Sequence, residues 1–242
     1  MVVIRPEKWG SLGEVELLIF LLDGSASMYE TNTFDGRRKA DHLVNILYDT
    51  LERLINSSRS NSFRASLVYF SDSVSIPTVD DLPYYPLEDA INELTDPVIK
   101  MAGGSTSIAN ALAETSKIVY EFNNDIGLPD QKNITLFLFT DGRENIRTPR
   151  DVINEALKVK SMGVTICTIS LGNDCDEKLL MDISSVASLR QVKRLDLANM
   201  LDFLKKEGGN YKLFLRGHVN GEINRNISEV IRSFVSILSE TR

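Results

Sequence analysis

Three stretches of the sequence carry side-chain oxygens of the kind that bind metal ions. The first is DGSAS at residues 23–27, where Asp23, Ser25 and Ser27 alternate directly after an apolar run. The second is GGSTSIANAL, which contains Thr106, and the third is TDGREN, which contains Asp141. Taken alone, DGSAS could equally be a turn or a helix cap, because Asp and Ser oxygens readily accept backbone N–H bonds.

The five side chains form a chemically uniform set. Two carboxylates and three hydroxyls are hard oxygen donors, and no His or Cys lies in the three stretches. This set suits Mg²⁺, Mn²⁺ or Ca²⁺ and disfavours Zn²⁺, which prefers nitrogen and sulfur ligands. We expect a divalent cation as the cofactor, with Mg²⁺ as the first choice. Mg²⁺ usually keeps some positions open for water or for an outside ligand.

The surrounding elements must bring the three stretches together. Continuously apolar segments at 17–22 and 134–139 are typical of strands buried on both faces. Further strand patterns lie at 65–70, 164–171 and 191–196. Helical spacing of apolar residues, or a short helical pattern, is found in the segments 37–55, 107–122, 149–163, 176–185 and 197–206.

Strands that alternate with helices predict an α/β fold, with a doubly wound, mostly parallel central sheet and helices on both faces. In such sheets ligands bind beyond the carboxyl ends of the strands, near the point where the strand order reverses. Asp23 and Asp141 each follow a segment predicted to be a buried strand. We therefore expect the three stretches to meet at one edge of the sheet.

The chain is expected to form one domain with a short lead-in and an extension. The boundaries are 1–13 for the lead-in, 14–207 for the domain and 208–242 for the extension. In the extension, 211–219 is interpreted as an edge strand and 222–240 as an amphipathic helix packed on the domain. The segment 73–104 contains four prolines, and we interpret it as a short strand, a loop and one helix near 88–95.

The three oxygen-rich stretches also carry a family resemblance. DGSAS fits the D-x-S-x-S signature of von Willebrand factor A (vWA) domains, whose fold is Rossmann-like. GGSTSIANAL resembles the family's Thr loop, LFLFTDGREN its Asp loop, and RASLVYFSDSV (64–74) its second strand. The order and spacing of the loops match over roughly 14–207, and three loops in order are a far more specific signal than one motif.

The resemblance implies a metal-ion-dependent adhesion site, or MIDAS. Ser25, Ser27 and Thr106 would ligate the metal through their hydroxyls, and Asp23 and Asp141 would act directly or through waters. The remaining position would accept a Glu or Asp from a partner protein. The resemblance therefore implies a non-enzymatic module that captures an acidic residue of its partner through the bound cation.

Two other functions stay open at this stage. A metal-dependent hydrolase acting on a phosphorylated substrate could use the same cation, and a pure scaffold could leave the site vacant. The D-x-D pair of haloacid-dehalogenase phosphatases is missing, because Leu21 and Ser25 stand two residues either side of Asp23. The chain also has no G-x-S-x-G frame and no Walker-type phosphate loop. His42 and His218, the two histidines, lie outside the three stretches.

Residues next to the candidate ligands are not themselves assigned to the metal site. Arg143 and Glu144 are interpreted as solvated loop residues. Tyr29 and Glu30 could line a partner surface or serve the scaffold. The segment 29–39 lengthens the connection from the motif to the first helix, which places it beside the expected site.

The amino-acid composition and charge of the chain narrow the classes of partner that it could bind. The chain has 242 residues and a net charge of −7, without a basic stripe, which argues against nucleic acid. Its two cysteines are expected to be free. The start MVVIRPEKWG lacks a long apolar segment, and no apolar run is long enough to span a membrane. We therefore expect a cytoplasmic protein similar to the bacterial stand-alone vWA proteins, including the TerY-like proteins of tellurite resistance and stress response. Partner identity and oligomeric state stay open.

Overall fold

The predicted α/β fold with a mostly parallel sheet is confirmed. The computed structural model describes residues 13–31, 36–172, 175–188, 204–207, 210–216, 218–219 and 222–223. The strands of the central sheet are β1 (Glu14–Asp23), β2 (Phe63–Phe70), β3 (Val74–Ser75), β4 (Gln131–Thr140), β5 (Thr165–Ser170), β6 (Val186–Ser188), β7 (Leu204–Glu207) and β8 (Asn210–Arg216). A separate pair is formed by β9 (His218–Val219) and β10 (Glu222–Ile223).

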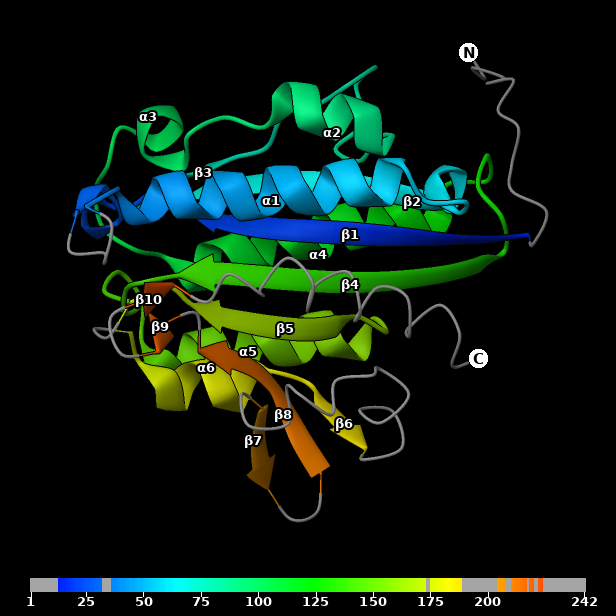
Figure 1. Ribbon diagram of the computed structural model, residues 1–242. Helices are drawn as coiled ribbons and strands as arrows, with labels where there is room; N and C mark the ends of the chain where they lie inside the picture. The colour runs from blue at the N-terminus through cyan, green and yellow to red at the C-terminus, as the bar shows by residue number, and fades with distance from the viewer. Residues whose placement is uncertain are drawn as a thin grey trace.

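The sheet has the order β3-β2-β1-β4-β5-β8-β6, and β7 also pairs with β8. Strands β2, β1, β4, β5 and β8 are mutually parallel, so their carboxyl ends lie at the same edge of the sheet. The arrowheads of β1, β4 and β5 point to this edge in Figure 1. From β1 the chain passes to β2 on one side and returns to β4 on the other. The switch point therefore lies between the carboxyl ends of β1 and β4, where doubly wound sheets place their ligands.

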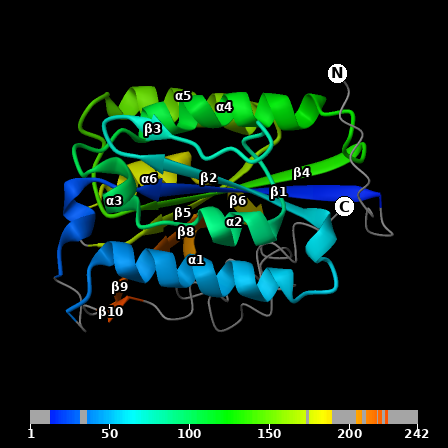
Figure 2. The same ribbon diagram turned by 90° about the horizontal axis from the view of Figure 1, so that it is seen from above.

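Helices cover both faces of the sheet, as Figure 2 shows. The helices on one face are α1 (Lys39–Ile55), α2 (Leu87–Glu93) and α3 (Pro97–Met101). The helices on the other face are α4 (Ile108–Asn124), α5 (Pro149–Ser161) and α6 (Glu177–Ile183). A turn of 3-10 helix, η1 (Ala26–Tyr29), follows β1 directly. In the described residues, no helix combines the length and the apolar character that a membrane crossing needs.

Strand β1 shows why its sequence is apolar without interruption. Every residue of β1 after Glu14 is buried, and successive side chains point to opposite faces. Leu18 and Phe20 belong to the core that α1 covers, whereas Leu17 and Ile19 belong to the core that α4 covers. Burying each such side chain contributes roughly 1.5–3 kcal/mol. The end of β1 is therefore held firmly from both sides.

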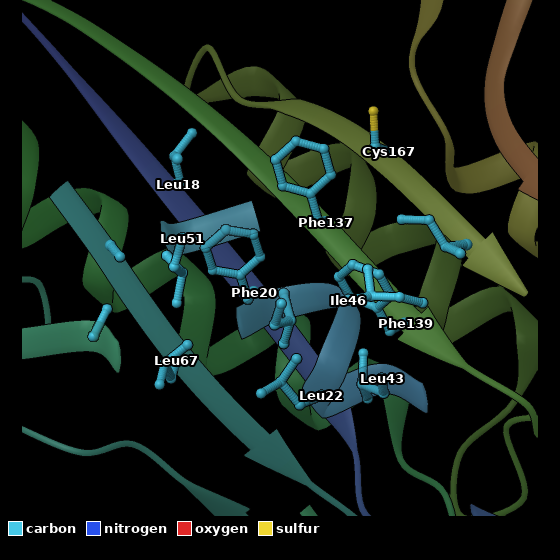
Figure 3. Packing of buried hydrophobic residues seen from close by; sticks show 14 of the residues in the cluster. Leu18, Phe20, Leu22, Leu43, Ile46, Leu51, Leu67, Phe137, Phe139 and Cys167 are labelled. Atoms are coloured by element: carbon cyan, nitrogen blue, oxygen red, sulfur yellow. The ribbon is translucent and has the colours of Figure 1, made fainter. Parts of the chain in front are cut away.

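The α1-side core joins helix to sheet across β1 and β4 (Figure 3). The rings of Phe20 and Phe137 stack with their centroids 5.6 Å apart. Leu43 and Leu47 of α1 belong to the same buried cluster, one helical turn from each other. This packing fixes the start of α1 relative to the carboxyl ends of the two strands.

Three predictions in the C-terminal part need correction. The helix predicted at 197–206 is wrong for its last residues, because Leu204–Glu207 form β7, paired antiparallel to β8. Residues 211–219 do not form an edge strand, since β8 lies between β5 and β6. The helix predicted at 222–240 is wrong at its start, where β10 pairs with β9. In each case strand pairing outweighs the local pattern.

Other predictions in the C-terminal part concern residues that the structure does not describe. These are the strand predicted at 191–196, the first part of the helix predicted at 197–206 (residues 197–203) and the part of the helix predicted at 222–240 that follows residue 223. Strand β8 begins beyond residue 207, where the sequence analysis ended the domain, and it pairs in parallel with β5.

Candidate metal centre

Asp23 connects the two strands at the switch point. It is the last residue of β1 and is fully buried. Its Oδ1 accepts a hydrogen bond from the backbone N–H of Ser25 at 2.8 Å. Its Oδ2 accepts one from the hydroxyl of Thr140, the last residue of β4. The carboxylate is thus held between the ends of β1 and β4.

Ser25 and Ser27 extend the cluster from Asp23 to Asp141. Ser25 precedes η1 and is buried, and its Oγ lies 3.2 Å from the Oγ of Ser27. The Ser27 hydroxyl donates to Asp141 Oδ1 at 2.7 Å. Asp141 follows β4 directly and is buried. The alternation of the two serines therefore directs both hydroxyls into the same small space.

Thr106 reaches the same space from the loop before α4. Its backbone N–H donates to Asn145 Oδ1 at 2.8 Å, and the N–H of Asn145 donates back to the Thr106 carbonyl at 3.1 Å. Gly142 shows how close the groups are. A Cβ at this glycine would lie 2.9 Å from Thr106 Oγ1 and 3.8 Å from Asp23 Oδ2. The structure therefore brings all five predicted side chains together.

The chemistry of the cluster fits a divalent cation. In the described parts of the chain, no group of three or more His, Cys, Asp or Glu side chains is placed to hold a metal, so the candidate ligands are hydroxyls and two carboxylates. Burial, together with the neighbouring Asp141 carboxylate, raises the pKa of Asp23 to about 6. Charge at Asp23 is therefore costly without a nearby cation, and a bound divalent ion would offset this cost.

Sequence reasoning missed one charged residue of the site, Lys39. The Lys39 Nζ lies 2.6 Å from Asp141 Oδ2 and 3.2 Å from Glu30 Oε2, and the lysine is almost completely buried. Burial opposes its charge, but the Asp141 and Glu30 carboxylates outweigh burial and raise the pKa of the ammonium. One sequence signal was present, because Lys39 lies on the same helix face as Leu43 and Ile46.

Glu144 also has a role that the sequence analysis did not assign. It was interpreted as a solvated residue, but its Oε2 accepts the backbone N–H of Ala109 in the first turn of α4 at 2.9 Å. Its Oε1 accepts the N–H groups of Ile146 and Arg147 at 3.0 and 2.8 Å. Glu144 therefore ties the Asp141 loop to the helix that follows Thr106.

A family model for the von Willebrand factor type A domain matches residues 18–206. The chain belongs to this family. The vWA match spans β1 to β7 and includes the three loops that meet at the cluster. The family resemblance drawn from the three motifs is thus confirmed, whereas the likeness to TerY proteins stays a prediction.

Solved structures show the same fold. Proximal thread matrix protein 1 from the mussel byssus, described with a zinc-occupied MIDAS motif, is 23% identical with a TM-score of 0.54, covering 72% of this chain and 42% of that one. Manganese-loaded TRAP protein of Plasmodium vivax is 20% identical with a TM-score of 0.52, covering 71% and 63%. A von Willebrand factor type A protein from Catenulispora acidiphila is 16% identical with a TM-score of 0.56, covering 71% and 36%. This vWA chain thus aligns with less than two thirds of the length of each.

Proposed function

We propose that this vWA domain captures an acidic residue of a partner protein through a divalent cation held by Asp23, Ser25, Ser27, Thr106 and Asp141. The observation that supports the proposal is the meeting of these five oxygen-bearing side chains at the switch point of the sheet. Two carboxylates and three neutral hydroxyls would leave a bound divalent ion able to accept one more negative ligand.

The bound ion would supply a Lewis-acidic position at the carboxyl edge of the sheet. The protein contributes the fixed geometry, because Asp23 and Asp141 follow the ends of two packed strands. Two of the similar proteins are described with zinc or manganese, which supports a divalent metal in this chain too. We propose Mg²⁺ as the physiological ion, with Mn²⁺ or Ca²⁺ as alternatives.

A binding role explains the carboxylates better than a hydrolytic one. A hydrolase would need a general base free to take a proton beside the metal. Asp23 accepts hydrogen bonds from Ser25 and Thr140, and Asp141 accepts them from Ser27 and Lys39. Both carboxylates are thus engaged in holding the loops. We therefore propose that the domain is not an enzyme.

The first test is metal binding. Titration calorimetry with Mg²⁺, Mn²⁺ and Ca²⁺ should detect one site in the wild type and none in Ser25→Ala/Ser27→Ala. Ser161→Ala is the control, because its exposed hydroxyl donates to the Lys158 carbonyl at the end of α5. Equal metal affinity in all three proteins would contradict the proposed ligands.

The second test is partner capture. Wild-type protein should retain a partner in Mg²⁺ and release it in EDTA, and the double-serine variant should retain none. Mutating the acidic residues of the captured partner one at a time should identify the residue that reaches the metal. Turnover of phosphoesters that requires Asp23 would favour the hydrolase alternative instead. The cytoplasmic location and a role in stress or tellurite resistance stay predictions, to be checked by fractionation and deletion in the native host.

A further inference from the structure

Lys39 places a positive charge inside the proposed metal centre. It is the first residue of α1, and its ammonium bridges Asp141 at 2.6 Å and Glu30 at 3.2 Å. The Lys39 side chain is 2% exposed and that of Asp141 is fully buried, whereas that of Glu30 is 51% exposed. The ion pair with Asp141 is therefore shielded from solvent, and the one with Glu30 is not.

The pair balances the charge of the metal-free site. Asp23 and Asp141 would otherwise bring two negative charges into a buried space, which is costly without a partner. Lys39 offsets one of them. A divalent cation bound by the same carboxylates would meet a like charge a few ångströms away, and such repulsion is strong where water is excluded.

Gly172 lies beside both members of the ion pair. A Cβ at Gly172 would lie 3.4 Å from Lys39 Nζ and 3.4 Å from Asp141 Cβ. The second carboxylate partner, Glu30, lies on the solvent side of the ammonium. Lys39 thus has one acceptor inside the site and one at its margin.

We propose that Lys39 is a built-in counter-cation of the metal centre, which stabilises the metal-free site and lowers its affinity for divalent ions. The inference rests on the metal site of the proposed function. With Lys39 present, a metal-loaded site carries a surplus positive charge, which favours an incoming carboxylate. Lys39 acts through Asp141 and is therefore a positioning residue, not a ligand.

The test compares Mn²⁺ affinity in wild type, Lys39→Met and Lys39→Gln by titration calorimetry. Both variants remove the charge and keep much of the side-chain volume. We expect Mn²⁺ to bind about 10- to 100-fold more tightly to both, because one repelling charge is gone. Lys117→Met is the matched control, since Lys117 is exposed on α4 and forms an ion pair with Glu114, three residues earlier on the same helix. The control should bind Mn²⁺ like the wild type.

A second measurement follows the metal-free state. In EDTA, Lys39→Met should melt at a lower temperature than the wild type. Saturating Mn²⁺ should raise the melting temperature of Lys39→Met by more than it raises that of the wild type. In the Asp141→Asn background the same substitution should change Mn²⁺ affinity much less, because the two residues act as a unit.

The outcomes separate this inference from the proposed function. If the wild type binds Mn²⁺ and the Lys39 variants bind it equally or less tightly, the counter-cation role is overturned and the metal site stands. If neither the wild type nor the folded Lys39 variants bind Mn²⁺, both proposals fail. Tighter binding in the variants and in the Lys117→Met control alike would reduce the effect to overall charge and overturn the role of Lys39.

Discussion

The Thr140 hydroxyl donates to Asp23 Oδ2, and this hydrogen bond joins the carboxyl ends of β1 and β4. The same hydroxyl accepts the backbone N–H of Gly142 at 3.1 Å. Thr140 therefore links the strand that ends at Asp23 to the loop that carries Asp141. A residue outside the D-x-S-x-S signature thus holds the two carboxylates in register.

Replacing Thr140 by valine should weaken metal binding while keeping the shape of the side chain. A hydrogen bond to a charged group is worth about 1.5–3 kcal/mol. We therefore expect a 10- to 100-fold loss of Mn²⁺ affinity in calorimetry. Thr135→Val is the control, since Thr135 bonds Glu16 nearer the start of β4. A loss of stability in both variants with unchanged metal affinity would limit Thr140 to a structural role.

Asp141→Asn should destabilise the metal-free protein. The substitution removes the buried carboxylate partner of Lys39 and leaves the ion pair with the half-exposed Glu30. Removing one member of a buried ion pair costs about 3–5 kcal/mol, and the remaining Glu30 contact favours the lower end. Urea denaturation in EDTA measures the loss. Lys39→Met/Asp141→Asn should be more stable than Asp141→Asn alone, and an additive loss would contradict a coupled pair.

Glu144→Ala should disturb the proposed metal centre without replacing any of its proposed ligands. The glutamate accepts three backbone N–H groups, one of them in the first turn of α4, where a negative charge is favourable. We expect a loss of about 1–2 kcal/mol in the free energy of unfolding and a several-fold weaker Mn²⁺ affinity. The control Glu155→Ala on α5 should change neither the free energy of unfolding nor the Mn²⁺ affinity strongly. Wild-type Mn²⁺ affinity in Glu144→Ala would show that the loop keeps its geometry without this contact.

The stability of the protein should rise between about pH 8 and pH 10 because of Lys160. Burial, and then the charge of Lys212, lower the pKa of Lys160 to about 8. An unfolded lysine titrates near 10.4, so the unfolded chain binds more protons in this window and stability increases with pH. Lys160→Met should flatten the rise in urea midpoints measured from pH 7 to pH 10. Lys158→Met, an exposed neighbour, should keep it. Parallel curves for Lys160→Met and wild type would refute the assignment.

The meeting of the five candidate side chains could be predicted because the positions of the two carboxylates follow from strand burial. Asp23 and Asp141 each end an apolar run, and parallel neighbours in a doubly wound sheet end at the same edge. Ser25 and Ser27 follow from the motif, and Thr106 from the loop before a periodic helix. These signals are local, so they can be found in the chain alone.

Lys39 and Glu144 could not be assigned in this way because their partners are distant in sequence. Lys39 pairs with a carboxylate 102 residues away, and Glu144 bonds a helix 35 residues earlier. Tertiary packing alone determines these contacts. The predictions for the C-terminal strands were wrong for a related reason. Strand β7 is defined by its pairing with β8 and not by its own short sequence pattern.

Gly24 gives the D-x-S-x-S signature a meaning specific to this chain. A Cβ at Gly24 would lie 2.3 Å from the carbonyl oxygen of Pro97 and 2.8 Å from Met101 Cγ, both in α3. A backbone oxygen cannot yield as a flexible side chain can, so even alanine at this position would push α3 away from η1. The nominally free position between Asp23 and Ser25 is therefore under steric constraint, and a larger residue there would need a compensating change in α3.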